Sequence, residues 1–240
     1  MKKLNIIIPI YNEERQLREH VEKVREYALK NLGEMEWKII VVDNKSSDNS
    51  NNICIELKND YKEFEFIRLE IKGKGIALRT ALERYDYDYA LMMDLDLSTD
   101  IKHIAEAMGK FAEGYDMVIG SRLTKGSKVI NRSLKRSTLS IINVILIKLI
   151  TRSRFHDFKC GFKAINVDTA KNLVPLTKDD TWFFDFELTL LAEKFGYKVF
   201  ELPVTWIDDK ESKVNVKKVA RADLGGSWRV MRERVWRSDK

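Results

Sequence analysis

Two aspartates separated by one residue follow an apolar run in the stretch YALMMDLDLSTD, Tyr89 to Asp100. Asp94 and Asp96 stand where a strand ends, and there the alternation of side chains between the two faces of a sheet breaks down. Both carboxylates can then approach one divalent cation, and their hard oxygen atoms suit Mg²⁺ or Mn²⁺. The pair therefore predicts a site for a metal-bridged diphosphate. The alternative is a turn that caps the helix expected at Ile101.

Asp43 ends another apolar run, WKIIVVD. A carboxylate at the end of a buried strand is costly unless it has a partner. We therefore expect Asp43 to accept hydrogen bonds from a nucleotide base or ribose. The residues that follow it, Ser46, Ser47 and Asp48, indicate the start of a helix.

The stretch KGKGIALRTAL combines glycine and lysine before another helical pattern. Gly73 and Gly75 permit a close approach of backbone to a ligand at a helix N-terminus, and Lys72 or Lys74 adds positive charge for phosphate. An ordinary turn is the alternative. The spacings of a P-loop and of a dinucleotide-binding GxGxxG motif are both absent, which weakens the case for an ATPase or a dinucleotide oxidoreductase.

A basic segment precedes an apolar one in the second half of the chain. Arg122 follows the strand-like VIGS, and RSLKRS at 132–137 leads into the apolar run LSIINVILIKLI. That run is shorter than the ~20 residues needed to cross a bilayer. A solvated basic helix end is the ordinary explanation of such charges. Beside an apolar helix, they also predict a surface that receives a lipid tail and its anionic head group.

Strand-like runs alternate with helix-like ones through the first half of the chain. The strand-like runs are LNIIIPI, WKIIVVD, FEFIRLE, YALMMDLDL and DMVIGSR, and a further one, YKVFELPVTW, lies near the end. This order predicts an α/β, Rossmann-like fold whose mainly parallel central sheet carries helices on both faces. Ligands bind at the carboxyl ends of the strands in such sheets, so the polar residues above should converge on one edge.

Composition excludes some classes of function but does not identify a single one. The chain has 240 residues, 44% of them hydrophobic, and a net charge of +6. This size fits one large domain or two small ones. Cys54 and Cys160 give neither a zinc site nor a disulfide framework, which fits a reducing cytosol. The basic charge permits a nucleic-acid partner, but aspartates at the strand ends argue against polyanion binding, so we expect none.

Eight ordered motifs together resemble the family 2 glycosyltransferases with the GT-A fold. They are IIIPIYNEE, VVDNKSSDNS, GKGIALRTAL, MMDLDLSTD, VIGSR, DFKCGFKAI, WFFDFELTLLA and ELPVTWIDDKESKV. Their order is most similar to that of the dolichyl-phosphate β-glucosyltransferases and the dolichyl-phosphate mannose synthases. The resemblance covers about the whole chain, and eight motifs in order are far more specific than any one of them.

The resemblance implies roles for particular residues. Those that would bind the nucleotide-sugar are Pro9, Tyr11, Asn12, Glu13, Asp43, Lys74, Asp94 and Lys213. Those that would meet the acceptor phosphate are Arg122, Arg132 and Ser137. Asp96, with Asp94, would bind Mg²⁺ or Mn²⁺, and catalysis would depend on Asp96, Arg122 and Asp185.

The sequence also departs from the family pattern at four positions. Ser98 stands where the mannose synthases tend to have glutamine, and Asn44 stands where a second aspartate is common. Leu95 and Leu97 replace smaller residues of the usual DADGAT, and we expect them to narrow the sugar pocket.

The implied reaction is an inverting transfer of a hexose from a nucleotide-sugar, with UDP-glucose favoured, to polyprenyl or dolichyl phosphate. Such a phosphate is already anionic near neutral pH, with a second pKa of about 6, so no strong base is required. One alternative is a sugar-hydroxyl acceptor in oligosaccharide or surface-polysaccharide synthesis. It would need Asp185 or Glu187 as base, with Asp185 expected to face the site. The other alternative is a GDP-mannose-dependent dolichyl-phosphate mannose synthase.

We expect residues 1–210 to form the transferase domain and 211–240 a basic amphipathic tail that packs on the domain or on a membrane surface. The eukaryotic glucosyltransferases that the chain resembles carry an N-terminal membrane anchor, and this sequence shows none. We therefore expect a cytoplasmic protein that is peripheral on the cytoplasmic face of a membrane.

Overall fold

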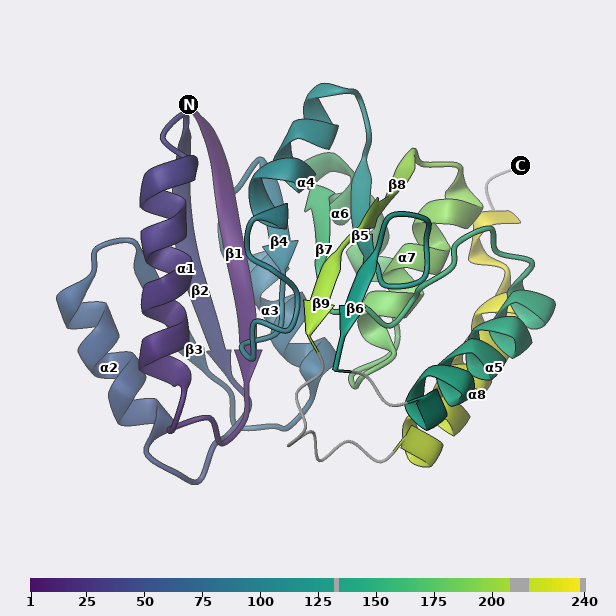
Figure 1. The fold of residues 1–240 in the computed structure, drawn as a ribbon, viewed down its shortest axis with the longest axis horizontal. Coiled ribbons are helices and arrows are strands. Elements are labelled where there is room, and N and C mark those ends of the chain that lie inside the picture. Colours follow the sequence, from purple (N-terminus) through teal and green to yellow (C-terminus); the bar gives the residue numbers. More distant parts are fainter. Residues whose placement is uncertain (132–133, 208–215, 238–240) are drawn as a thin grey trace.

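The computed structural model describes residues 1–131, 134–207 and 216–237, with the side chains of 134–140 and 216–219 outside the description. A seven-stranded sheet in the order β3-β2-β1-β4-β7-β5-β8 forms its centre (Figure 1). The strands are β1 (Lys2–Ile10), β2 (Met35–Asp43), β3 (Phe64–Arg68), β4 (Tyr89–Met92), β5 (Met117–Ser121), β7 (Lys163–Asn166) and β8 (Val199–Pro203). Only β7 runs antiparallel to its neighbours, β4 and β5. The predicted mainly parallel α/β sheet is confirmed.

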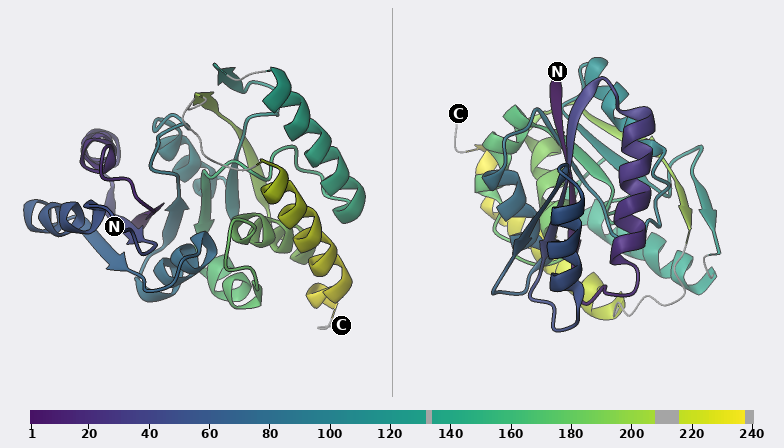
Figure 2. Two further views of the ribbon diagram at one scale, coloured as in Figure 1. Left: turned by 90° about the horizontal axis from the view of Figure 1, so that it is seen from below. Right: turned by 90° about the vertical axis from the view of Figure 1, so that its left-hand side faces the viewer.

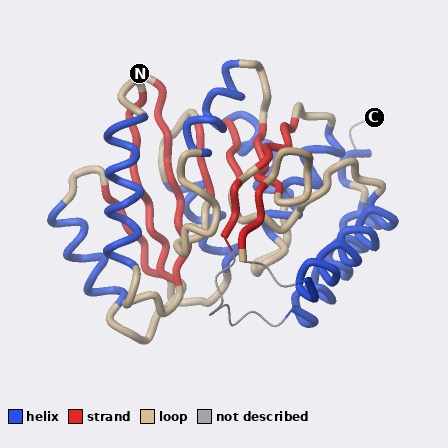
Figure 3. The backbone as a smooth tube through the Cα atoms, viewed as in Figure 1, coloured by secondary structure: helices blue, strands red, loops and turns tan. Residues whose placement is uncertain are grey.

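Helices cover both faces of this sheet (Figure 3). One face packs on α1 (Leu17–Asn31), α2 (Ser50–Asp60) and α4 (His103–Ala112). The other packs on α3 (Lys74–Arg84), α6 (Val167–Leu173) and α7 (Phe184–Phe195). β1 and β2 contribute alternate residues to the two hydrophobic clusters, which is why their sequences read as continuous apolar runs.

Local sequence explains where several helices begin and end. α1 buries Leu17, Val21, Val24 and Ala28 at the spacing of one helical face. The side chain of Asn166 caps α6 by accepting a hydrogen bond from Thr169 N. α7 ends at Gly196, whose positive φ of 84° is cheap for glycine and places its N–H on the last carbonyls of the helix.

The strand order reverses beside β1, which has β2 on one side and β4 on the other. The chain therefore leaves the carboxyl end of β1 toward one side of the sheet and that of β4 toward the other. A crevice opens between these two strand ends. The segments that follow β1, β2 and β4 carry the polar residues singled out in the sequence, so the topology gathers them at one edge.

A small second sheet stands beside this edge. It pairs β6 (Lys128–Ile130) with β9 (Thr205–Ile207) in parallel. The sequence predicted one strand through YKVFELPVTW, but Val204 separates β8 from β9, because its N–H bonds to Ser121 O of β5 while its carbonyl accepts from Lys128 N. β9 thereby leaves the main sheet and reaches the loop after β4 that carries Asp94 and Asp96. There Ile207 N donates to Ser98 O.

Two long helices, α5 (Leu134–Thr151) and α8 (Val216–Glu233), lie side by side at one end of the molecule (Figures 1 and 2). α8 also contacts α7, and its Val230 is buried in the hydrophobic cluster of that face. A short 3-10 helix, Val235–Arg237, follows it. Most of the segment expected as a tail is thus helix packed on the rest of the fold. Within the described residues, no helix combines the length and the apolar character needed to cross a membrane.

Two adjacent glycines in α8 allow a direct test of this packing. A Cβ added to Gly226 would lie 2.5 Å from the buried ring of Phe183, whereas one added to Gly225 would meet nothing within 4 Å. We expect Gly226→Ala to lower the free energy of unfolding by about 1–2 kcal/mol through overpacking. Gly225→Ala should raise it by about 0.5–1 kcal/mol through helix propensity. Urea unfolding measures both, and an equal gain in the two variants would contradict this packing.

Candidate functional site

The loops that follow β1 and β2 are joined by hydrogen bonds into one rigid edge. Asn12 has a positive φ of 57°, and its side-chain oxygen accepts from Ser47 N at 2.8 Å. Asn12 N donates to Ser46 Oγ at 2.9 Å, and Glu13 N donates to Ser50 Oγ at 3.0 Å. The serines expected at a helix start therefore hold this loop instead, and α2 begins only at Ser50.

Two more residues predicted to bind the nucleotide lie on the same edge. Pro9 lies in β1 opposite Val42 of β2. Tyr11 is partly exposed, and the Lys72 ammonium lies 3.8 Å from its ring centroid and hydrogen-bonds its hydroxyl. An exposed aromatic ring next to a cation provides a surface on which a base can stack.

Asp43 is wholly buried at the end of β2. Its Oδ1 accepts from Ser46 N at 2.9 Å, whereas its Oδ2 has no hydrogen-bond partner among the described residues. The nearest cation is Arg68, whose Nη1 lies 4.0 Å from Oδ2. A buried carboxylate oxygen without a donor is costly, so this atom fits a ligand N–H or O–H.

A cluster of alternating charges lies at the end of β4. Lys74 Nζ contacts Asp94 Oδ1 at 2.7 Å and Asp185 Oδ2 at 3.7 Å. The other oxygen of Asp185 contacts Lys163 Nζ at 3.2 Å. Lys163 is fully buried, and its ammonium also donates to the carbonyls of Phe158 and Cys160 at 3.0 and 2.8 Å. We name these four residues, Lys74, Asp94, Asp185 and Lys163, the charge cluster.

The contact between Lys74 and Asp94 fixes the ionisation of these two members of the charge cluster. Burial opposes the charge on Asp94, but the Lys74 ammonium outweighs it and holds the pKa of this carboxyl below its usual value. Burial likewise opposes the charge on Lys74, yet Asp94 and then Asp185 raise the pKa of its ammonium. Both groups therefore stay charged near neutral pH.

Asp96 lies beside Asp94 in the lining of a surface hollow. Its side chain is exposed, and its Oδ1 accepts from Ser98 N at 2.9 Å, an interaction that orients the carboxylate within the turn. The turn expected after Asp96 is therefore present. Asp96 caps no helix, because α4 begins only at His103. No group of three or more His, Cys, Asp or Glu side chains in the described residues is placed to hold a metal. One or two carboxylates completed by phosphate oxygens fit the usual habit of Mg²⁺ or Mn²⁺, so the residues present fit such an ion.

Gly73 and Gly75 serve a different purpose from the one expected. A Cβ at Gly73 would lie 2.3 Å from Asp180 O, and one at Gly75 would lie 2.7 Å from Asp179 O. The close approach that the structure shows at these glycines is to the protein's own loop before α7. Ile76 N donates to Asp180 O at 3.3 Å and joins the two segments.

Arg122 is held by a carboxylate of the protein itself. Its guanidinium makes a two-pronged contact with Asp157 at 2.7 and 2.9 Å, and its backbone N donates to the same carboxylate at 3.0 Å. Burial raises the pKa of Asp157, but the Arg122 charge outweighs it and lowers that pKa to about 2. The Arg122 guanidinium also lies 5.1 Å from the ring centroid of Trp206. An acceptor phosphate that binds here would share the Arg122 guanidinium with the Asp157 carboxylate.

The two acidic residues in the first turn of α7 have separate surroundings. Asp185 joins the charge cluster, as the sequence predicted for the inward residue. Glu187 is buried elsewhere: its Oε2 accepts from Lys178 N and Asp179 N, and its Oε1 pairs with Arg229 of α8 at 2.8 Å. Glu187 therefore holds the fold together and is not placed to act as a base.

Three predicted site residues are not placed by the structure. Arg132 and Lys213 lie outside the described residues. Ser137 belongs to α5, but its side chain is outside the description. Their roles stay predictions.

The residues that depart from the family pattern mostly hold the loops at this edge of the sheet in place, through core packing or hydrogen bonds. Leu95 is buried in the hydrophobic cluster on the α1 side, and Leu97, with a positive φ of 52°, packs against that cluster. The expectation that Leu95 narrows the sugar pocket is therefore wrong, because its side chain points into the core. Asn44 donates to Ile10 O at 3.2 Å and accepts from Gly73 N at 3.3 Å, so it joins three loops.

Sequence reasoning missed three residues that shape the site: Lys163, Asp157 and Gly161. A Cβ at Gly161 would lie 2.0 Å from Asp94 Oδ2, so only glycine fits against this carboxylate. All three belong to the quoted motif DFKCGFKAI, but the motif alone does not show which charge each residue meets.

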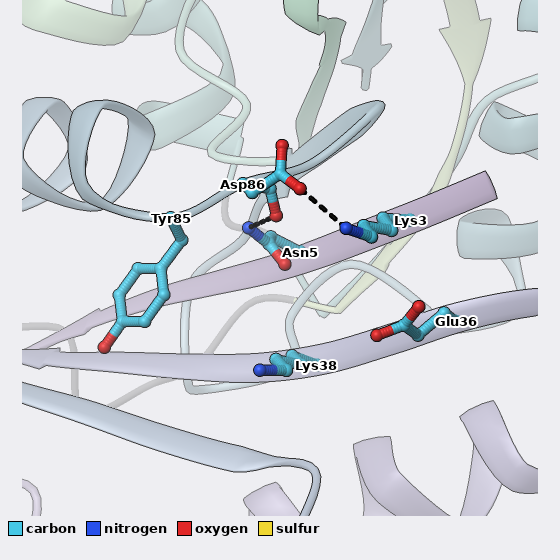
Figure 4. Close-up of a pocket in the computed structure, with 6 residues that line it drawn as sticks. All are labelled: Lys3, Asn5, Glu36, Lys38, Tyr85 and Asp86. Atoms are coloured by element: carbon cyan, nitrogen blue, oxygen red, sulfur yellow. Dashed lines mark hydrogen bonds and ion pairs between the residues drawn. The ribbon is translucent and has the colours of Figure 1, made fainter.

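Hollows in the surface occur at both ends of the sheet. One is lined by Met93, Asp94, Asp96, Ser98, Thr99 and Trp206 and belongs to the site above. The other lies toward the amino ends of β1 and β2, where Lys3 pairs with Asp86 at 2.6 Å and Asn5 donates to Asp86 O at 3.3 Å (Figure 4). This hollow lies far along the strands from the charge cluster, and three of its polar residues bond to one another.

Comparison with known proteins adds sequence relatives. The model of the family "Glycosyl transferase family 2" matches residues 5–174. Glycosyltransferase AglD of Haloferax volcanii is 29% identical over 95% of this chain, which spans only 36% of that protein's length. The dolichyl-phosphate β-glucosyltransferase of Saccharomyces cerevisiae is 26% identical over 88% of this chain and 69% of its own length.

Solved structures share the fold at low sequence identity. Glucosyl-3-phosphoglycerate synthase of Mycobacterium tuberculosis, in complex with Mn²⁺, UDP-glucose and phosphoglyceric acid, superposes with a TM-score of 0.70 at 14% identity over 96% of this chain and 79% of that chain. The mannosyltransferase PcManGT of Pyrobaculum calidifontis, in complex with GDP-Man and Mn²⁺, gives a TM-score of 0.60 at 17% identity over 92% of this chain and 61% of that chain. These matches confirm the GT-A-like fold.

The buried pair Arg122–Asp157 gives a stability prediction. Asp157→Asn leaves a buried guanidinium without its counter-ion and should lower the free energy of unfolding by about 3–5 kcal/mol at pH 7. The control is Asp60→Asn, which removes an exposed partner of Arg18 at 2.9 Å and should cost less than about 1 kcal/mol. Urea unfolding measures both variants.

The pH dependence of this loss follows from the pKa of Asp157. Folding lowers it from 3.8 to about 2, so the ionised form favours the folded state. The stabilisation is complete above pH 4 and is lost as the pH falls toward 2. The gap between wild type and Asp157→Asn should therefore narrow across that interval. A gap that stays constant would show that Asp157 acts through packing alone.

Proposed function

The chain belongs to glycosyl transferase family 2, and on that premise we propose that it transfers a hexose from a nucleotide-sugar to a polyprenyl or dolichyl phosphate, with inversion at the anomeric carbon. UDP-glucose is the favoured donor. Several of its relatives are dolichyl-phosphate β-glucosyltransferases, and a protein of the same fold was solved with UDP-glucose.

The charge cluster is the observation that carries this proposal. Asp185 has one oxygen on Lys163 and the other near Lys74. Both oxygens of this carboxylate thus face ammonium groups of the protein itself, so neither is placed to receive the proton of a sugar hydroxyl. A phosphate monoester needs no such acceptor, because it is already ionised above its second pKa of about 6. The site therefore suits an acceptor that arrives with its charge.

The residues have distinct tasks in this reaction. The unpartnered oxygen of Asp43 and the ring of Tyr11 would bind the base and ribose, and Asp96 would hold Mg²⁺ or Mn²⁺ against the diphosphate. The bound ion would stabilise the negative charge that develops on the leaving group. Lys74 would add its positive charge beside the same group.

The transfer exchanges one bond for another. An oxygen of the acceptor phosphate forms a bond to the anomeric carbon as the bond from that carbon to the diphosphate oxygen breaks, and the diphosphate keeps the electron pair. Attack opposite the leaving group converts an α-linked donor into a β-linked product. No proton has to move in this step. Arg122, with one carboxylate as its partner, would offset the charge of the incoming phosphate.

The lipid part of the acceptor would lie along α5, and we propose that this helix places the protein peripherally on the cytoplasmic face of a membrane. Large aliphatic side chains on one side of α5 are 42–72% exposed; they are Ile141, Ile142, Ile145, Leu146 and Leu149. We name them the α5 apolar face. Such a face is costly in water but favourable at a lipid interface, and the basic residues before it suit anionic head groups.

The metal ligand can be tested by turnover. Asp96→Asn should lower the rate of glucosyl transfer from UDP-glucose to dolichyl phosphate by about 10²–10³-fold, because the charge on the leaving diphosphate is no longer offset. The control Asp86→Asn changes an exposed aspartate of the opposite hollow and should keep the wild-type rate. Extraction of labelled glycolipid measures the product. Equal rates in both variants would show that Asp96 has no part in the mechanism. Product formed from GDP-mannose but not from UDP-glucose would show that the donor is GDP-mannose.

The α5 apolar face can be tested with vesicles. The double substitution Ile145→Glu and Leu149→Glu should weaken binding to phosphatidylserine-containing vesicles at least about tenfold, since each aliphatic side chain contributes about 1.5–3 kcal/mol when buried. The matched control is Leu29→Glu with Ile55→Glu, two similarly exposed aliphatic residues on α1 and α2. Co-sedimentation measures binding. Equal loss in the two double variants would rule out α5 as the docking surface.

A further inference from the structure

Trp182 is an unusual residue in the loop before α7. Its side chain is 53% exposed, whereas the next two residues, Phe183 and Phe184, are fully buried. The exposed indole gains little from the hydrophobic core. A large apolar ring kept in water beside polar groups is typical of a binding surface.

The loop that carries Trp182 is rigid, because its backbone is bonded on both sides. Asp179 Oδ1 accepts from Thr181 N at 2.7 Å and from Phe183 N at 3.2 Å. Arg79 of α3 pairs with Asp180 at 2.5 Å and donates to Asp179 O at 3.1 Å. These bonds fix the backbone from which the indole projects, which lowers the entropic cost of binding against it.

This loop places the indole at the charge cluster. The Lys74 ammonium lies 5.1 Å from the ring centroid of Trp182, and the same ammonium contacts Asp94 at 2.7 Å and Asp185 at 3.7 Å. The site thus combines one flat apolar wall with charged groups that can bond to hydroxyls. Tyr11 and Asp43 belong to the other end of the crevice, beyond β1, where the base would lie.

We propose that Trp182 is a specificity-determining residue that forms the apolar wall of the hexose subsite, an inference that rests on the function proposed above. A pyranose whose hydroxyls are equatorial carries C–H bonds on its ring faces and its hydroxyls around its edge. The indole contacts the C–H face, and Lys74, Asp94 and Asp185 contact the hydroxyl edge. An axial hydroxyl points out of the ring face and disrupts the contact with the indole, so the wall selects among hexoses.

The test compares binding of UDP with that of UDP-glucose, both with Mn²⁺ and without acceptor, by calorimetry. Trp182→Ala should weaken UDP-glucose binding by about fivefold, the scale of one aromatic contact, and leave UDP binding within about twofold. Trp182→Phe should restore most of the loss, because it keeps a flat ring. Trp228→Ala is the matched control: this tryptophan is 64% exposed on α8, and both affinities should stay at the wild-type values.

Each other outcome is decisive. If Trp182→Ala changes UDP and UDP-glucose binding equally, or neither, the wall is not at the hexose, although the proposed function stands. If it instead raises only the KM for the lipid phosphate, the indole contacts the acceptor and the proposal is overturned. If wild type binds UDP-glucose no differently in the presence and absence of Mn²⁺ and forms no glycolipid, the proposed function fails first and this inference with it.

Discussion

One fully buried lysine determines the geometry of the reaction end of this molecule. Lys163 has no exposed surface, and an ammonium can be buried only when its donors are bonded and its charge is paired. Two of its contacts are carbonyls of the 157–161 loop and the third is Asp185 of α7. That loop carries Asp157, which orients Arg122, and Gly161, which lies against Asp94. Moving Lys163 would therefore disturb both Arg122 and Asp94.

The same loop connects the reaction end to the helix pair α5 and α8, which we propose lies on a membrane. Lys159 forms an ion pair with Asp223 of α8, and Asn143 of α5 donates to the same carboxylate at 3.4 Å. Burial raises the pKa of Asp223, and Lys159 opposes the rise. Asp223 thus joins the helix pair α5 and α8 to the loop that sets the positions of Arg122 and Asp94. The lipid phosphate would reach the charge cluster from the helices that hold its tail.

The sequence was sufficient for most strands of the sheet and for the edge at which the strand-end carboxylates gather, because runs of β-branched residues and strand-end aspartates are local patterns. It was insufficient wherever two distant segments meet. Nothing local shows that Gly73 and Gly75 face the 179–180 backbone, or that Leu95 points into the core. The break at Val204 depends on bonds to two other strands. The partners of Asp185 lie on α3 and β7, which are distant from α7 in the sequence. The contacts of Asp185 could therefore not be predicted from its local sequence.

The central claim is that the acceptor is a phosphate that attacks without a base. Phosphorus NMR of a reaction that contains UDP-glucose, Mn²⁺ and a short-chain polyprenyl phosphate tests it directly. If the phosphate is the nucleophile, the resonance of the phosphate monoester disappears and that of a glucosyl phosphodiester with a β-linked anomeric carbon replaces it as UDP is released. Release of UDP with the monoester unchanged, and glucose found on a hydroxyl group, would contradict it.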